Sequence, residues 1–185
     1  MIDATEFAKN FPNAAVPDAL QKLLDFGNNT SGPDFYAAGF ELIVNEAPGM
    51  LESYSSDPVF LHALRVFAQA SAGGSLYALW RTDTDWDAAP IIAFGDEGGF
   101  AVIAQNIREL LQLLTLDTES RIGWDGVGMN RQEGDPVSPA SEQYKAWLKT
   151  NFNLDAIAAA KPLIAAAQAK HQTAFGQWMS TYYSQ

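Results

Sequence analysis

Apolar residues recur at helical spacing near the start of the chain. In VPDALQKLLDFG they occupy positions that share one side of a helix, namely Val16, Ala19, Leu20, Leu23 and Leu24. Pro17 suits the first turn of a helix, and Gly27 suits its end. The pattern therefore predicts a helix over residues 17–26.

Strand-forming runs occupy the middle of the chain. FELIVN (40–45), SLYALWRT (75–82), PIIAFG (90–95) and GFAVIA (99–104) are rich in branched and aromatic residues, and turn-forming residues separate them. The last three runs follow one another with short connections, which predicts a meander. The span VFLHALRVFAQAS stays open, because Phe60, Leu64 and Phe67 fit a helix while its last residues fit an extended run.

Helical patterns return after the meander. In NIRELLQLLTL, Asn106 is suited to cap the first turn and Glu109 follows three residues later. Residues 117–136 are rich in glycine and acidic residues and predict a loop. Ser138 and Pro139 are expected to begin a further helix. The last helix is predicted from about Pro162 to Tyr182, with a seam of Ile164, Ala167, His171, Phe175, Trp178 and Tyr182.

Strands in the middle with helices around them predict one α+β domain over residues 1–185. The expected architecture is a mixed or mainly antiparallel central sheet flanked by helices, with a helical C-terminal part at about 138–183. Trp80 lies within a strand run and His171 lies on the apolar seam, so we expect both side chains to pack in the interior.

Composition agrees with a folded chain. Of its 185 residues 48% are hydrophobic, 12% are aromatic and only 18% are charged, whereas disorder requires low hydrophobicity and high charge. No secretory signal is visible, and no apolar run approaches the roughly 20 residues of a membrane span. These features predict an intracellular, cytoplasmic protein. The absence of cysteine excludes disulfides, thiolate nucleophiles and cysteine-based zinc sites.

The charge narrows the choice of partner. With 22 acidic and 11 basic side chains, the formal net charge is -11. Such a field repels phosphate backbones and anionic lipids, so we expect neither a nucleic acid nor a membrane as partner. A basic protein partner agrees with this charge, and solubility alone is the simpler explanation.

Asp96 and Glu97 stand side by side between two strand runs, which suggests an acid/base pair at first sight. Neighbouring residues of a strand point to opposite faces, so two such carboxylates could not converge on one substrate atom. In a turn both side chains meet water. The glycines of GDEGG supply the backbone freedom that a turn requires, so the sequence predicts a solvated hairpin tip.

Other chemical motifs fail on inspection. The spacing of Asp83, Asp85 and Asp87 resembles the start of a calcium loop, but its sixth position is Ala88 and its twelfth is Phe94. GGSLY lacks the second glycine of a nucleophile elbow, and GWDGVGMN lacks dinucleotide-loop spacing. The two histidines, residues 62 and 171, form no metal-binding pair. The sequence therefore predicts no enzyme, no catalytic residue, no cofactor and no metal.

The acidic connection DTDWDAA is the first candidate for a partner-binding surface. Three carboxylates surround an aromatic side chain that lacks an evident packing role, and aromatic residues are favoured at interface hot spots. The predicted partner-binding residues are those of this connection and of the hairpin tip: Asp83, Asp85, Trp86, Asp87, Asp96 and Glu97.

Three blocks in order, GGSLYALW, PIIAFGDEGG and AVIAQNIRELLQLL, resemble the SUKH superfamily. The superfamily includes a fungal cell-wall-synthesis regulator and bacterial proteins regarded as immunity partners of secreted toxins. The similar positions are Gly74, Ser75, Tyr77, Ala78, Trp80, Pro90, Gly95, Glu97, Gly98, Ala104, Asn106, Leu110, Leu111 and Leu114. The resemblance is best over residues 74–116 and looser in the tryptophan-containing C-terminal helices. It implies a binding module with a mixed sheet flanked by helices and no catalytic residues.

Two classes of function follow. The first is an intracellular protein-binding module of the immunity type, which binds and neutralises a cognate toxin. Its acidic surface would contact a basic domain of that toxin, such as a nuclease. The alternative is a small-molecule-binding domain or a regulatory scaffold. A toxin gene directly upstream would favour the first class, and an operon of metabolic enzymes would favour the second.

Overall fold

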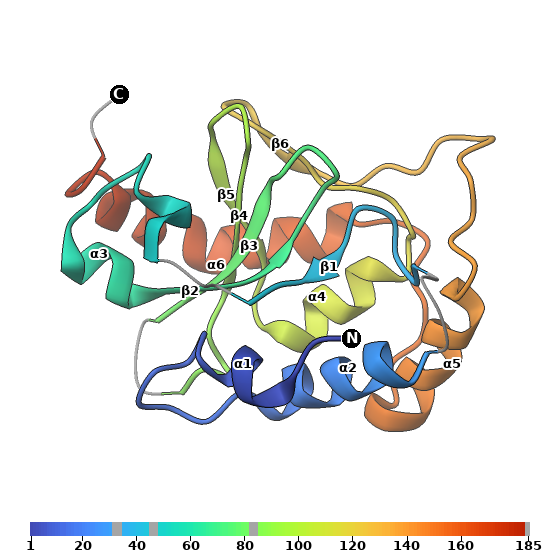
Figure 1. The fold of residues 1–185 in the computed structure, drawn as a ribbon. Coiled ribbons are helices and arrows are strands. Elements are labelled where there is room, and N and C mark those ends of the chain that lie inside the picture. The colour runs from blue at the N-terminus through green and yellow to red at the C-terminus, as the bar shows by residue number, and fades with distance from the viewer. Residues whose placement is uncertain (31–34, 45–47, 82–84, 184–185) are drawn as a thin grey trace.

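A five-stranded antiparallel sheet forms the centre of the protein (Figure 1). The computed structural model describes residues 1–30, 35–44, 48–81 and 85–183. The strands are β1 (Glu41–Leu42), β2 (Leu64–Gln69), β3 (Leu76–Trp80), β4 (Ile91–Phe94) and β5 (Phe100–Ala104). Their order in the sheet is their order along the chain, and every neighbouring pair is antiparallel. The α+β fold and the meander are confirmed.

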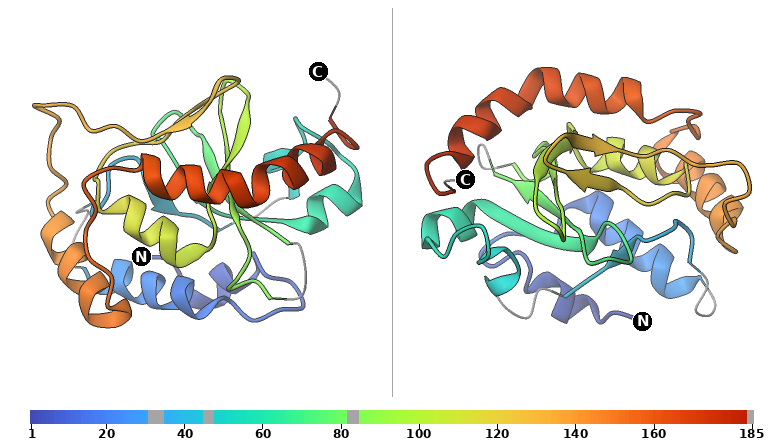
Figure 2. Two further views of the ribbon diagram at one scale, coloured as in Figure 1. Left: turned by 180° about the vertical axis from the view of Figure 1, so that it is seen from behind. Right: turned by 90° about the horizontal axis from the view of Figure 1, so that it is seen from above.

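Helices cover both faces of the sheet, which explains why β3 and β4 are buried at every position. One face packs against α1 (Ala4–Ala8), α2 (Asp18–Asn29), α4 (Ile107–Leu114) and α5 (Ser141–Phe152). The other packs against α3 (Pro58–Ala63) and α6 (Lys161–Met179). Figure 2 shows α6 along one side of the sheet and α1 and α2 along the other. Alternation along β3 sends Tyr77 to the first core and Trp80 to the second.

Polar side chains fix the starts of two helices. Asp57 accepts the backbone N–H of Val59 at 2.7 Å and caps α3. The predicted cap Asn106 accepts the N–H of Glu109 at 3.1 Å, and the Glu109 carboxylate accepts the N–H of Gln105 at 2.8 Å. These bonds satisfy N–H groups that the first turn of a helix leaves without a partner.

Several predicted boundaries change. The strand predicted at 40–45 is limited to the two residues of β1, and position 45 lies outside the described residues. The open span resolves as α3 followed directly by β2, with the short 3-10 helix η1 (Pro48–Leu51) before it. The prediction of a loop throughout 117–136 is wrong, because β6 (Arg121–Gly123) and β7 (Gly126–Gly128) form an antiparallel hairpin there.

The β6–β7 hairpin packs on the tip between β4 and β5. The tip residues Gly98 and Gly99 have positive φ angles of 97° and 82°. A β-carbon on Gly99 would lie 2.4 Å from the carbonyl carbon of Gly123, and one on Gly98 would lie 2.6 Å from the Trp124 ring. Only glycine permits this close approach. Three of the six strand residues are glycines, so apolar periodicity does not reveal this hairpin.

The start of the C-terminal helix α5 differs from the predicted start. The predicted cap Ser138 is wrong for α5, which begins at Ser141 with Ala140 as its N-cap residue. Along α6 the predicted seam is buried at Phe175 and half-buried at His171. Gln172 accepts the backbone N–H of Val102 at 2.8 Å, so α6 covers the edge strand β5.

Among the described residues, no helix combines the length and the apolar character needed to cross a bilayer.

Candidate functional site

The predicted acidic connection serves the local fold. Asp83 lies outside the described residues. Asp85 is exposed and accepts the backbone N–H of Asp87 at 2.9 Å, which closes a small turn. Burial and the nearby Asp85 charge raise the pKa of Asp87, while a hydrogen bond from the backbone N–H of Asp18 opposes this rise. Asp87 thus supplies an acceptor to the first residue of α2, which has no side-chain cap of its own.

Trp86 is buried, so the expectation that its side chain lacks a packing role is wrong. It is 7% exposed and belongs to the core between the sheet and α1 and α2. Its ring meets Phe11 edge to face at a centroid distance of 6.3 Å. The guanidinium groups of Arg65 and Arg81 lie 5.1 and 5.8 Å from the centre of the ring. Trp86 is buried because the Phe11 ring contacts its apolar surface and the two guanidinium groups lie near its electron-rich ring.

Asp96 and Glu97 are exposed in the turn between β4 and β5, so the predicted hairpin tip is confirmed. Asp96 accepts the hydroxyl of Ser75 at 2.7 Å, and this bond lowers the pKa of Asp96. The tip follows β4, whereas the Asp85–Asp87 turn precedes it. The two acidic groups therefore lie at opposite ends of one strand and do not combine into one site.

A different surface, around β1, has the features of a binding site. Phe35 is 59% exposed and Val137 is 65% exposed, although both are large apolar side chains. Two hollows adjoin there, and both are lined by Phe35, Phe40 and Glu41. We call the hollow of about 310 Å³ that also includes Leu24 of α2 the α2 hollow. The other, of about 530 Å³, is the Val137 hollow, and together they form the β1 face.

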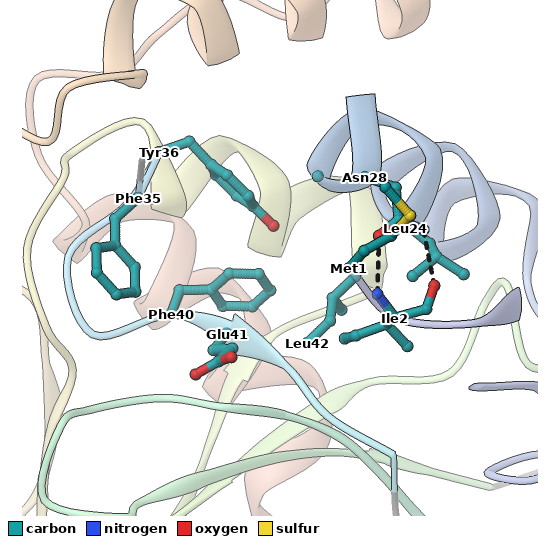
Figure 3. A pocket seen from close by; sticks show the side chains of 10 residues that line it. Met1, Ile2, Leu24, Asn28, Phe35, Tyr36, Phe40, Glu41 and Leu42 are labelled. Atoms are coloured by element: carbon teal, nitrogen blue, oxygen red, sulfur yellow. Dashed lines mark hydrogen bonds between the residues drawn. The ribbon is translucent and has the colours of Figure 1, made fainter. Parts of the chain in front are cut away.

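The α2 hollow has a rigid aromatic wall. Tyr36 stacks on Tyr144 of α5 at 5.0 Å and meets Phe26 of α2 edge to face at 5.3 Å. Phe40 lies 6.2 Å from Tyr77 of β3. Figure 3 shows the Tyr36 and Phe40 rings facing the hollow, with the Glu41 carboxylate below Phe40. The wall is thus held in place by ring contacts from α2, α5 and β3.

The opposite wall is held by hydrogen bonds. The side-chain amide of Asn28 accepts the backbone N–H of Ile2 at 2.9 Å and donates to its carbonyl oxygen at 2.8 Å (Figure 3). This two-bond arrangement fixes the start of the described chain against α2. Both sides of the hollow are therefore defined before any partner arrives, which reduces the ordering that binding requires.

The Val137 hollow depends on Asp117, which is 3% exposed and has a positive φ of 52°. Its carboxylate accepts the backbone N–H groups of Ala38 at 3.0 Å and of Ser138 at 2.8 Å, and the Ser138 hydroxyl as well. Arg131 pairs with the same carboxylate at 3.2 Å. Ala38 and Ser138 line the hollow from segments about 100 residues apart, so Asp117 joins its two walls.

The backbone of β1 adds hydrogen-bonding groups to this surface. The N–H of Ile43 donates to the Phe67 carbonyl oxygen at 3.0 Å, and the register pairs Leu42 with Ala68. Successive residues of an antiparallel strand turn their N–H and C=O groups alternately towards and away from the neighbour. The N–H and C=O of Leu42 therefore point away from β2, at the edge of the sheet, where the residue as a whole is 6% exposed.

The β1 face is acidic. Among the described residues that line the two hollows, Glu41 has the only charged side chain. Glu41 is exposed, and its carboxylate forms no hydrogen bond or ion pair with another described residue. Burial and the nearby Glu41 charge both raise the pKa of the Tyr36 hydroxyl.

The described residues of the β1 face include a carboxylate and aromatic rings, and among them no acid is paired with a base and no nucleophile is activated. Within the part of the chain that the structure describes, His, Asp and Glu side chains form no group of three that could hold a metal ion. The arrangement is suited to binding, because it offers apolar area, a polar rim and free backbone groups.

Sequence reasoning missed Phe35, Glu41 and Val137. The aromatic cluster of DFYAAGFE, directly before a short strand, was an available signal for the first two. Val137 lies between Pro136 and Ser138 in a segment without periodicity, and only the tertiary contact through Asp117 brings it to β1.

Comparison with protein-family models, curated proteins and solved structures finds no match to this chain.

Proposed function

We propose that the protein is an intracellular protein-binding module and that the β1 face is its docking surface. The observation that carries the proposal is the exposure of Phe35 and Val137 in a hollow that Glu41 also lines. Large apolar side chains gathered at the free edge of a sheet mark a surface that a partner covers. An added strand could also pair with the free N–H and C=O of Leu42.

Charge supports a basic partner. The net charge of -11 gives a field that attracts positive surfaces over a distance and accelerates encounter. Glu41 then supplies a local contact without a competing partner among the described residues. The resemblance to the SUKH superfamily adds a role to this chemistry, since its bacterial members include immunity proteins. We therefore propose a toxin with a basic domain, neutralised in the cytoplasm, as the partner.

Affinity capture tests the surface. The tagged protein is used to capture partners from a lysate of its source organism, in parallel with Val137→Glu and Val59→Glu. Val59 is 62% exposed on α3, across the sheet, so its variant adds the same charge on another surface. We expect Val59→Glu to capture the same basic protein as the wild type, and Val137→Glu to bind it at least about tenfold more weakly, as for an interface hot spot.

Equal affinity of the two variants for the captured protein would contradict the β1 face as the docking surface. The immunity role has a separate readout. Expression of the captured protein alone is expected to arrest growth, and coexpression of the wild type or Val59→Glu is expected to relieve the arrest. A captured protein without effect on growth would contradict the immunity role and leave the binding function in place.

A further inference from the structure

We propose that the α2 hollow takes one cationic side chain of the partner, a lysine or an arginine, between its aromatic wall and Glu41. The inference rests on the proposed function, because it names the part of a protein partner that enters the β1 face. It also adds a chemical specificity that exposure of apolar area alone would not give.

The rings that line the hollow leave room for a cation at their faces. Tyr36 and Phe40 have centroids 5.9 Å apart and planes inclined at 54°, so neither ring covers the other (Figure 3). Phe35 projects beside them and makes no ring contact with another described aromatic residue. Ammonium and guanidinium groups are attracted to ring faces within about 6 Å of the centroid. Three rings from one short segment thus line the hollow, where Tyr144 covers one face of Tyr36 and Phe35 is the most exposed ring.

The polar groups of the hollow also favour a cation. The Glu41 carboxylate has no hydrogen bond or ion pair with a described residue, so it is available as a counter-ion. The Tyr36 hydroxyl points into the hollow and has no such partner either, so its oxygen can accept a hydrogen bond from an N–H group (Figure 3). The Glu41 charge also raises the pKa of this hydroxyl, so the two groups are close enough to interact electrostatically.

The apolar part of the lining fits the stem of a long basic side chain. Leu24 and Leu42 line the same hollow as Glu41, and neither carries a polar side-chain atom. Lysine and arginine bury their methylene groups against such surfaces while the charged end remains at a polar site. The volume of about 310 Å³ accommodates one such side chain.

Other occupants fit less well. An anionic side chain would meet Glu41 and the overall negative field, with no cationic side chain in the described lining to receive it. A neutral apolar side chain would exclude water from the Glu41 carboxylate without replacing its hydrogen bonds. A cationic group neutralises the Glu41 carboxylate and donates hydrogen bonds in place of the displaced water. The lining of the hollow therefore favours a cationic side chain.

Two small probes that share their four side-chain carbons and differ by the terminal ammonium group test the selection. N-acetyl-lysine methylamide is titrated against the labelled protein and followed by NMR at the Glu41 and Leu42 amides, and N-acetyl-norleucine methylamide is the uncharged control. We expect the norleucine probe to bind at least about fivefold more weakly, as a cation–π contact and an ion pair together imply. Added salt is expected to weaken the lysine probe alone.

Variants of the protein assign the effect. Glu41→Gln keeps the shape and is expected to weaken the lysine probe about threefold. Glu52→Gln is the matched control, because Glu52 is exposed, forms no ion pair with a described residue and does not line the hollow. Thermal melts of both variants verify that they fold. A selective lysine response that is weakened about threefold in Glu41→Gln and unchanged in Glu52→Gln supports the inference.

Equal binding of the two probes, or an unchanged lysine response in Glu41→Gln, would overturn cation capture in the α2 hollow. This outcome is distinct from failure of the proposed function, which is read from Val137→Glu and the captured protein. Loss of the partner in Val137→Glu without lysine selectivity would retain the docking surface and refute only its cationic specificity.

Discussion

Replacing Asp117 by alanine is expected to lower the free energy of unfolding by about 3–5 kcal/mol, the range for removing one member of a buried ion pair. The carboxylate receives two backbone N–H groups, a hydroxyl and a guanidinium group. Its removal leaves the buried N–H of Ser138 without this acceptor, at a cost of about 1–3 kcal/mol, and the half-buried N–H of Ala38 as well. Urea denaturation followed by circular dichroism measures the change.

Asp125→Ala is the matched control, because Asp125 is an exposed carboxylate on the β6–β7 turn and forms no ion pair with a described residue. We expect its effect to stay within about 0.5 kcal/mol. A loss below about 1 kcal/mol in Asp117→Ala would show that the segments around Ala38 and Ser138 do not depend on this carboxylate. The Val137 hollow would then lack the support that we assign to it.

Replacing Trp80 by alanine is expected to lower the free energy of unfolding by a similar amount, about 3–5 kcal/mol. Trp80 is 6% exposed and packs against two rings of α6, Phe175 at 5.0 Å and Trp178 at 5.5 Å. Its removal leaves a cavity between β3 and α6 that the paired sheet cannot close by relaxation. Chemical denaturation gives the change in free energy.

Trp124→Ala provides the comparison for Trp80→Ala, since Trp124 is 57% exposed and stacks only on Tyr183 among the described rings. We expect its effect to be about 1 kcal/mol or less. If both tryptophan variants lost the same small amount, the second core between the sheet and α6 would not be the stable unit that its burial indicates.

The sequence predicted the parts of the fold that local patterns encode. Apolar runs, glycines and Asn106 predicted the positions of the strands β3, β4 and β5 and of the helix α4. The β6–β7 hairpin escaped prediction because it packs on the β4–β5 tip, and half of its strand residues are glycine. The start of α5 was wrong because Ser138 bonds to Asp117 instead of capping the helix.

The candidate site was harder to predict than the fold. The composition of DTDWDAA suggested an exposed aromatic anchor. Trp86 instead packs against the guanidinium groups of Arg65 and Arg81, and composition does not reveal such contacts. The β1 face is assembled from five segments, near residues 1–2, 24–28, 35–42, 69–72 and 136–139. No period or motif connects them, and the structure alone shows that they meet at one strand edge.

Amide hydrogen exchange of the protein with and without its captured partner tests most directly that the β1 face is the docking surface. Binding is expected to slow exchange at residues 35–43 and 137–138, with the largest change at Leu42, whose N–H points to the free edge of the sheet. Unchanged exchange at these residues would contradict this account. Protection confined to the Asp85–Asp87 turn, or to the tip formed by Asp96 and Glu97, would place the partner on the acidic surfaces instead.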